Sequence, residues 1–212
     1  MTRIILQRHG ESMANARHVY AGQSDFHLSE RGREQALLGA QALAETHVDA
    51  IYSSSLARAY ETAEPHAELR GLEIHPSDQL REIFLGEWES AERDFLLENY
   101  PYEAGFIWHE YFGLFRAPGG ESAPAAGERF EREIIRIAKE NPDATVLVTA
   151  HAAVIRLFWG RISGYEPHEI AKKIPFPSNA SFSYVDWDGE KLIPVRYSDD
   201  DHIKSLGAEI LK

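Results

Sequence analysis

Short apolar runs alternate with amphipathic stretches along most of the chain of 212 residues. Continuous apolar sequence predicts buried strands, which we expect at Arg3–Gln7, Ala50–Ser53, Leu72–His75 (ended by Pro76) and Thr145–Thr149. Apolar residues at helical spacing predict helices, which we expect over 29–45, from Ser55 as N-cap through His66, over Glu121–Glu140 and over Ala152–Ile162. Strands that alternate with helices are typical of a mostly parallel sheet with helices on both faces, so the pattern predicts an α/β three-layer sandwich.

The last part of the chain carries a hairpin signal. Two strand-like stretches, Phe182–Trp187 and Lys191–Tyr197, flank the dipeptide Asp188-Gly189. An Asp-Gly pair between apolar runs indicates a tight β-turn. We therefore expect an antiparallel C-terminal hairpin at an edge of the sheet.

A region rich in aromatic residues lies between Trp88 and Gly120. It contains Phe95, Tyr100, Tyr102, Phe106, Trp108, Tyr111, Phe112 and Phe115. We interpret it as a helical insertion at about 88–120. It could be a cap over a ligand site that shapes substrate choice, or simply an aromatic part of the core.

Composition narrows the class of protein. The length suits a single domain over residues 1–212 that includes the insertion. The formal net charge of −12 disfavours nucleic acid and anionic membranes as partners, and no apolar run approaches the ~20 residues that span a bilayer. The absence of cysteine excludes thiolate metal sites and cysteine nucleophiles. The N-terminal apolar run is too short for a signal peptide, so we expect a soluble cytoplasmic protein, and its edge strands and surface helices could also serve a homodimer.

Three polar clusters follow three of the predicted strands, at Arg8–Ser12, at Ser53–Arg58 and at His151. In a parallel α/β sheet, ligands bind beyond the carboxyl ends of the strands. We therefore expect the three clusters to meet in one crevice, whichever family the chain belongs to.

The side chains of these clusters suit phosphoryl transfer. Arg8 and Arg58 carry guanidinium groups that match phosphate oxygens bidentately, and Arg58 is expected in the first turn of its helix, where free N–H groups add positive character. His9 is an available nucleophile, because neighbouring cations keep its imidazole unprotonated. His151 can donate a hydrogen bond to the equatorial oxygens of a transferred phosphoryl group.

A metal site is the alternative interpretation of the two histidines. Glu11 or Glu82 could supply a third ligand to such a site. Two arginines in the same pocket would oppose a divalent cation, so we expect no metal.

Six sequence blocks extend the pattern along most of the chain. They are Arg8-His9-Gly10-Glu11-Ser12 with Asn15, Gly22-Gln23-Ser24-Asp25 with Leu28–Gly32, Tyr52–Ala59 with Thr62-Ala63, Leu80-Arg81-Glu82-Ile83 with Leu85–Glu89, Pro118–Ser122, and Val146–His151. In this order they resemble the blocks of the histidine phosphatase superfamily, also called the phosphoglycerate mutase-like family. The tripeptide Arg-His-Gly alone would be weak evidence, whereas six blocks in order are specific.

The resemblance implies a role for each matching residue of the phosphate pocket. It implies that His9 becomes phosphorylated. Arg8, Arg58 and His151 would form the rest of the pocket around the phosphoryl group.

The resemblance also implies the proton donor and the substrate contacts. Glu82 would give a proton to the leaving oxygen and then act as the base that activates water. Asn15, Gly22 and Gln23 would contact the substrate. The resemblance implies that no metal is needed, and we expect no cofactor.

Several positions depart from the family's pattern. Ala152 follows His151 where glycine is usual, Ala21 stands where many members have a hydrogen-bonding residue, and Gln23 replaces a common aromatic residue. These departures leave the predicted catalytic set intact and bear on substrate choice.

The residues after Glu82 distinguish the activities found within the family. Mutases of this kind carry a Glu-Arg-His-Tyr-Gly stretch after the acid, whereas this chain continues with Ile-Phe-Leu-Gly-Glu-Trp-Glu, which resembles the phosphatase branch. We therefore expect a phosphatase that hydrolyses small-molecule phosphate monoesters through a phosphohistidine intermediate on His9. The alternatives are a cofactor-dependent phosphoglycerate mutase and a catalytically silent module that binds a phosphorylated ligand.

Overall fold

The computed structural model describes residues 1–108 and 111–206. Its main sheet has six strands in the order β4-β3-β6-β1-β7-β8. The bounds are β1 (Thr2–Arg8), β3 (Ala50–Ser54), β4 (Ile74–Ser77), β6 (Thr145–Ala150), β7 (Phe182–Trp187) and β8 (Leu192–Asp199). Strands β4, β3, β6 and β1 are mutually parallel; β7 pairs antiparallel with β1, and β8 pairs antiparallel with β7. The mostly parallel sheet and its antiparallel C-terminal pair are therefore confirmed.

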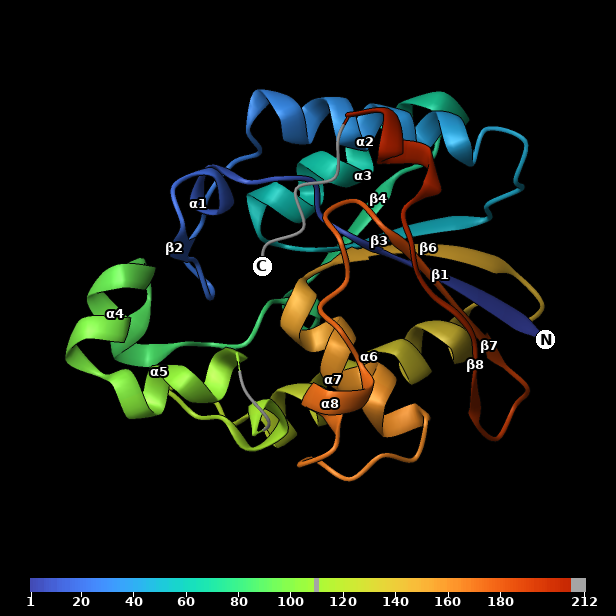
Figure 1. Cartoon of the computed structure of the whole chain (residues 1–212). Helices are drawn as coiled ribbons and strands as arrows, with labels where there is room; N and C mark the ends of the chain where they lie inside the picture. Colours follow the sequence, from blue (N-terminus) through green and yellow to red (C-terminus); the bar gives the residue numbers. More distant parts are fainter. Residues whose placement is uncertain (109–110, 207–212) are drawn as a thin grey trace.

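Helices cover both faces of this sheet (Figure 1). Helices α2 and α3 lie on one face, and α6 and α7 lie on the other. Their bounds are α2 (Glu30–Ala42), α3 (Ala57–Arg70), α6 (Ala123–Glu140) and α7 (Ala152–Ile162). Because both faces are covered, the apolar residues Ile4–Leu6 at the centre of β1 are at most 1% exposed. The predicted α/β three-layer sandwich is confirmed.

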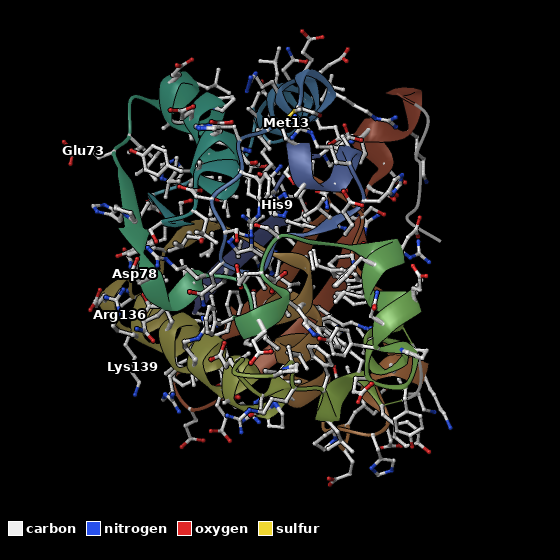
Figure 2. The ribbon with its side chains drawn as sticks, turned by 90° about the vertical axis from the view of Figure 1, so that its left-hand side faces the viewer. His9, Met13, Glu73, Asp78, Arg136 and Lys139 are labelled. Atoms are coloured by element: carbon white, nitrogen blue, oxygen red, sulfur yellow. The ribbon has the colours of Figure 1, made fainter. Side chains whose placement is uncertain are left out.

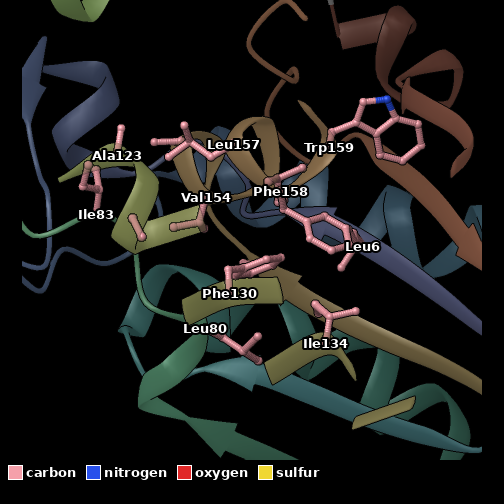
Figure 3. Packing of buried hydrophobic residues seen from close by; sticks show 14 of the residues in the cluster. Leu6, Leu80, Ile83, Ala123, Phe130, Ile134, Val154, Leu157, Phe158 and Trp159 are labelled. Carbon is pink, nitrogen blue, oxygen red and sulfur yellow. The ribbon is translucent and has the colours of Figure 1, made fainter. Parts of the chain in front are cut away.

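Apolar side chains between the sheet and its helices form two clusters. The larger one lies under α6 and α7, where Phe130, Ile134, Val154 and Phe158 are fully buried (Figure 3). The smaller one, with Ile51 at its centre, lies under α2 and α3. Each fully buried side chain of this size contributes about 1.5–3 kcal/mol, so the clusters fix the helices against the strand ends that carry the polar residues.

Short elements connect these layers. They are α1 (Met13–Ala16), β2 (Val19–Tyr20), η1 (Asp78–Leu80), η2 (Gly86–Trp88), α8 (Ile170–Lys173) and η4 (Asp201–Leu206). Among the described residues, no helix has both the length and the apolar composition to cross a membrane.

The segment between 88 and 120 contains further short elements. They are β5 (Ala91–Glu92), α4 (Arg93–Asn99), α5 (Pro101–Trp108) and η3 (Phe112–Leu114), and β5 pairs with β2. The aromatic residues there differ in exposure, since Phe112 and Phe115 are buried whereas Tyr102 is 78% exposed. The side chains of Phe106 and Trp108 lie outside the described residues. The role of the segment as a cap stays a prediction.

The predicted strand at Leu72–His75 is displaced along the chain. β4 begins at Ile74 and continues through Pro76, which lies opposite Ser53 of β3. The prediction that Pro76 ends the strand is therefore wrong. β4 is an edge strand, so a residue without an N–H group removes no hydrogen bond from the ladder.

The start of α3 also differs from the prediction. Ser55 does not cap the helix, because the N-cap is Leu56, which makes no side-chain hydrogen bond. The carboxylate of Asp25 accepts a hydrogen bond of 2.7 Å from the backbone N–H of Ala57 instead. A residue distant in sequence thus caps the helix that carries Arg58.

Candidate active site

The three polar clusters meet at the carboxyl ends of neighbouring strands. β6 lies between β1 and β3, so His9 after β1 and His151 after β6 come side by side, and their ring centroids are 5.2 Å apart. Figure 2 shows His9 near the middle of the molecule. Arg58 lies in the first turn of α3, as predicted.

A pocket of about 180 Å³ opens at these strand ends. Of the predicted site residues, Arg8, His9, Asn15, Gly22, Arg58 and Glu82 line it. Gln23 and His151 are not among the lining residues of the described chain. Gln23 donates its side-chain amide to the carbonyl oxygen of Glu82 at 3.0 Å, so it supports the pocket wall, and His151 is fully buried next to His9.

His9 has the protonation state and tautomer that a nucleophile needs. Its Nδ1 lies 2.6 Å from the carbonyl oxygen of Gly10, which can only accept, so Nδ1 carries the proton and Nε2 keeps its lone pair. Burial, followed by the charges of Arg58 and Arg8, holds the pKa of His9 well below its ordinary value of 6.5. The imidazole is therefore neutral at neutral pH.

Gly10 is required by close packing of the backbone. A Cβ at this position would lie 2.4 Å from the carbonyl oxygen of Gly32. The glycine therefore allows the loop after β1 to contact the start of α2 closely.

Two buried arginines give the pocket its positive charge. Arg8 donates to the carbonyl oxygen of Pro177 at 2.6 Å, and Arg58 donates to those of Gly22 at 2.7 Å and Ser24 at 3.0 Å. Burial lowers the pKa of each arginine to about 10, so both remain charged at neutral pH. Within the described chain neither forms an ion pair with a carboxylate. Buried cations without such a partner favour an anionic ligand.

Asn15 also lines the pocket and lies in α1, the short helix that follows the His9 loop. Its Oδ1 accepts from the backbone N–H of Ser12 at 3.0 Å in a capping box, and from the amide of Asn179 at 3.3 Å. Asn179 also donates to the carbonyl oxygen of His9 at 3.1 Å. This network joins the loop before β7 to the loop after β1.

The carboxyl group of Glu82 is held at the N-terminus of α7. It accepts from the backbone N–H groups of Ala153 at 3.0 Å and Val154 at 3.2 Å, and from that of Ile83 at 2.9 Å. Free N–H groups of a helix start are good partners for a carboxylate. Glu82 is therefore oriented by backbone at the pocket wall, and it is not a surface ion pair.

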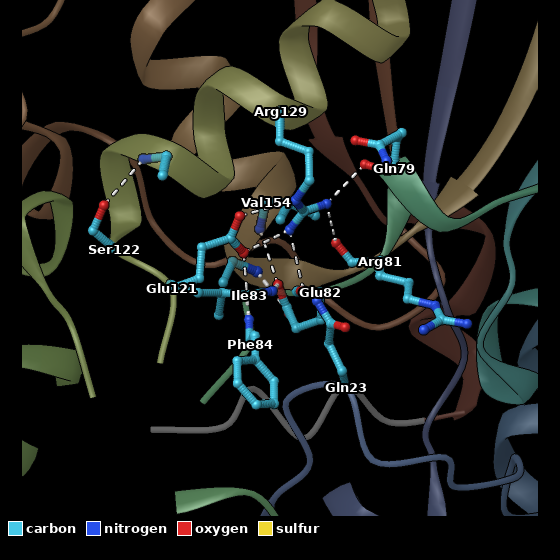
Figure 4. A network of polar contacts seen from close by, with 12 residues as sticks. Gln23, Gln79, Arg81, Glu82, Ile83, Phe84, Glu121, Ser122, Arg129 and Val154 are labelled. Carbon is cyan, nitrogen blue, oxygen red and sulfur yellow. Dashed lines mark hydrogen bonds and ion pairs between the residues drawn. The ribbon is translucent and has the colours of Figure 1, made fainter. Parts of the chain in front are cut away.

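Arg129 of α6, which the sequence patterns do not single out, holds the segment that carries Glu82 (Figure 4). Its guanidinium donates to the carbonyl oxygens of Gln79 at 2.7 Å, Arg81 at 2.9 Å and Glu82 at 3.3 Å. It also pairs with the carboxylate of Glu121 at 2.8 Å. No spacing along the sequence marks this contact, because it joins segments about 50 residues apart.

The outer wall of the pocket is apolar, and the sequence patterns pointed only to Phe112 and Phe115 of it, as part of the aromatic segment that could cap a ligand site. It is formed by Ile83, Leu85, Phe112, Phe115 and Phe176. Arg156 of α7 lies against this wall, with its guanidinium carbon 4.7 Å from the ring centroid of Phe112 and 4.2 Å from that of Phe176. The segments carrying these rings are far apart in sequence, so hydropathy alone could not assemble them.

Among the described residues, no group of three His, Asp or Glu side chains is placed to hold a metal ion. Glu11, one of the two alternative ligands, accepts a hydrogen bond from Ser29 at 2.6 Å and does not line the pocket. Glu82, the other, is engaged by backbone N–H groups.

Comparisons with known proteins agree with this geometry. Residues 4–200 match the family model of the histidine phosphatase superfamily (branch 1). The chain is 32% identical to phosphoserine phosphatase 1 of Hydrogenobacter thermophilus, over 100% of this chain and 99% of that protein. The solved structure of Bacillus stearothermophilus YhfR is 27% identical with a TM-score of 0.90 and covers 96% of this chain and 100% of its own. A mycobacterial glucosyl-3-phosphoglycerate phosphatase with VO3 is 26% identical with a TM-score of 0.85, covering 93% and 99%. The chain therefore belongs to the histidine phosphatase superfamily.

Proposed function

We propose that this chain, a phosphatase of the histidine phosphatase superfamily, hydrolyses phosphate monoesters through a phosphohistidine intermediate on His9. One observation carries the proposal: the neutral, buried imidazole of His9 shares its pocket with two buried arginines that form no ion pair with a carboxylate of the described chain. Such cations favour an anion. Phosphate is an anion whose oxygens the guanidinium groups of Arg8 and Arg58 match bidentately.

The first step transfers the phosphoryl group to the protein. The Nε2 lone pair of His9 attacks phosphorus, and the bond between phosphorus and the ester oxygen breaks. The carboxyl group of Glu82 gives its proton to the departing oxygen. The position of both side chains in the lining of one pocket supports this assignment.

The second step returns the enzyme to its starting state. The carboxylate of Glu82 takes a proton from a water molecule, whose oxygen attacks phosphorus. The bond between phosphorus and Nε2 of His9 then breaks, and inorganic phosphate leaves. Throughout, Arg8, Arg58 and His151 would stabilise the charge on the transferred group without a metal or another cofactor.

The apolar outer wall supports an organic substrate with an apolar leaving group. Ile83, Leu85, Phe112, Phe115 and Phe176 offer such a group a surface that a three-carbon acid would not fill. The net charge of −12 supports a small-molecule substrate over nucleic acid or an anionic membrane. A cytoplasmic location and a homodimer stay predictions from the sequence.

Phosphate release from p-nitrophenyl phosphate in the presence of EDTA tests the reaction. We expect turnover by the wild type and a loss of at least about 10³-fold in kcat for His9→Ala, because the nucleophile is gone. The exposed His168 provides a matched control, and His168→Ala should retain wild-type kcat. Because the P–N bond of phosphohistidine is labile in acid, samples are quenched with alkali and kept at alkaline pH; intact-mass spectrometry should then detect one added phosphoryl group on the wild type only.

Two further substrates test the class of ester. We expect kcat/KM for 1-naphthyl phosphate to exceed that for O-phospho-L-serine by about tenfold or more, because a buried ring gains about 1.5–3 kcal/mol. Full activity of His9→Ala would contradict the proposed nucleophile. Interconversion of 3-phosphoglycerate in the presence of 2,3-bisphosphoglycerate, with little phosphate release, would establish the mutase instead.

A further inference from the structure

A buried serine contacts the second histidine of the site. Ser54, the last residue of β3, lies beside His151, which follows the neighbouring strand β6. The distance between Ser54 Oγ and His151 Nε2 is 2.7 Å. Both residues are 0% exposed, so solvent does not take part in this hydrogen bond.

The proton in this hydrogen bond can be assigned by counting donors and acceptors. Ser54 Oγ already accepts from the backbone N–H of Leu56 at 3.3 Å. If its own hydroxyl proton goes to His151 Nε2, every polar group at this contact is satisfied. If instead His151 donated, the buried hydroxyl proton would have no acceptor among the described residues. The serine is therefore the donor, and Nε2 is the acceptor.

This assignment fixes the tautomer of His151. A neutral imidazole carries one proton, so an accepting Nε2 places that proton on Nδ1. Burial, followed by the charge of Arg58, lowers the pKa of His151 well below 6.5, which keeps the ring neutral. Nδ1 is buried and has no hydrogen-bond partner in the described chain. The fold thus leaves one N–H donor unsatisfied, next to the ring of His9.

The two histidines of the site are consequently held in opposite tautomers. The carbonyl oxygen of Gly10 keeps the proton of His9 on Nδ1 and leaves Nε2 as a lone pair. The hydroxyl of Ser54 leaves His151 with an N–H group on Nδ1. A lone pair in that place would repel the oxygens of a phosphoryl group, whereas an N–H group attracts them.

We propose that Ser54 is a positioning residue for phosphoryl transfer, whose hydroxyl holds His151 in the Nδ1–H tautomer so that this N–H serves the phosphoryl group on His9. The proposal rests on the phosphatase mechanism above. Ser54 touches neither the substrate nor the reacting atoms and acts only through His151.

The ¹⁵N chemical shifts of the imidazole nitrogens test the tautomer directly. The wild-type protein, ¹⁵N-labelled at histidine, is measured with and without vanadate as a phosphoryl analogue, and a His151→Gln variant identifies the signals of His151. We expect a protonated Nδ1 and an unprotonated Nε2. A protonated Nε2 of His151 in the wild type would overturn the proposal, irrespective of the kcat measured for any variant.

Substitutions of two adjacent serines test the consequence for catalysis. Ser54→Ala removes the donor, and we expect kcat to fall on the order of 10- to 100-fold with KM within about threefold, because a mis-set transition-state donor affects kcat. Ser53 is the matched control, since it is equally buried and donates to the backbone oxygen of Ser54 at 2.8 Å instead. Ser53→Ala should keep both kcat and the tautomer.

The outcomes separate this proposal from the mechanism on which it rests. Equal kcat for Ser54→Ala and Ser53→Ala would overturn the role of Ser54, even if phosphate release still depends on His9. Conversely, a wild type that hydrolyses no phosphate monoester contradicts the proposed function, while the shifts of His151 still report its tautomer. Mixed tautomers of His151 in Ser54→Ala, together with reduced kcat, would support the proposal.

Discussion

At the scale of single residues, the geometry distinguishes most clearly among the carboxylates that could give a proton to the leaving oxygen. Besides Glu82, the blocks that resemble the family contain two other carboxylates, Glu11 and Glu87, that could compete for this role. Glu11 accepts a hydrogen bond from Ser29, and Glu87 is exposed. Of the three, Glu82 alone lines the pocket among the described residues, and three backbone N–H groups orient its carboxyl group.

Replacing Glu82 with glutamine should therefore slow esters that need a proton on their leaving oxygen. We expect kcat for O-phospho-L-serine to fall about 10²- to 10⁴-fold in Glu82→Gln, the usual range for a lost general acid. The loss in the first step should be smaller for p-nitrophenyl phosphate, because nitrophenolate leaves without a proton. Single-turnover release of each leaving group measures this difference.

Glu87→Gln is the control for this experiment, because it removes a neighbouring carboxylate that is exposed to solvent. It should leave both rates near those of the wild type. An equal fall in the rate of leaving-group release for both esters in Glu82→Gln would contradict the role of Glu82 as proton donor.

At the scale of elements, the sequence predicts a helix or strand best where its bounds follow from neighbouring residues alone. The bounds predicted for α7 and β7 match the structure, because α7 is a mostly apolar stretch after His151 and β7 ends at the Asp188-Gly189 turn signal. The wrong boundaries at Pro76 and Ser55 have another origin. The edge position of β4 tolerates proline, and a distant carboxylate, that of Asp25, caps α3. Neither fact is local to the sequence.

The link between α6 and the Glu82 segment is a further property of elements. Arg129 is mostly buried, with its side chain 13% exposed, and it donates to three carbonyl oxygens of residues 79–82. The backbone groups on both sides of Glu82 are thereby tied to the longest helix. The carboxyl group of Glu82 is thus held by N–H groups of α7, and its backbone is held by Arg129 of α6.

Arg129→Met should loosen this link. We expect the free energy of unfolding to fall by about 2 kcal/mol or more, because hydrogen bonds to a charged group are lost and carbonyl oxygens are left without a donor. We also expect kcat to fall about tenfold with phosphate inhibition unchanged, since misplacing a catalytic group slows the reaction without removing the phosphate pocket. Urea unfolding and steady-state kinetics measure the two effects.

Arg132 on the same helix provides the matched control, with a side chain that is 72% exposed and a single long ion pair to Glu128 at 3.8 Å. Arg132→Met should change the free energy of unfolding by less than about 0.5 kcal/mol. Wild-type kcat in Arg129→Met, despite a lower stability, would mean that α6 does not position Glu82.

At the scale of the whole molecule, the local charge of the pocket is opposite in sign to the net charge of the protein. The chain carries a net charge of −12, yet its pocket is built around two buried arginines. The sequence predicted this local charge, because Arg8 and Arg58 follow strands whose ends must meet. Of the apolar outer wall, the sequence pointed to Phe112 and Phe115 as part of a possible cap. It did not point to Phe176, which meets Phe112 only in the folded protein.

The same burial that prepares the site makes the whole fold sensitive to acid. His9, His151 and His66 are 4%, 0% and 0% exposed, and burial is the first cause of the lowered pKa of each. Nε2 of His66 lies 2.9 Å from Oε1 of Gln7 in the core, and the pKa of His66 falls from 6.5 to about 3. In the unfolded chain these histidines bind protons below pH 6.5, while in the native protein they stay neutral. The unfolding free energy therefore falls as the pH falls below that value.

His66 isolates this effect, because it lies outside the proposed catalytic set. Once the unfolded form is fully protonated, each such histidine contributes a slope of about 1.4 kcal/mol per pH unit. We expect urea unfolding of His66→Gln to show a slope smaller by about that amount between about pH 6 and 5, above the range in which carboxylates with a lowered pKa, such as Glu133, lose their stabilising charge. His168→Gln, at an exposed histidine, should reproduce the wild-type slope. Identical slopes for all three proteins would mean that His66 takes up its proton in the native state, and the packing of α3 against β1 would then have to open to admit it.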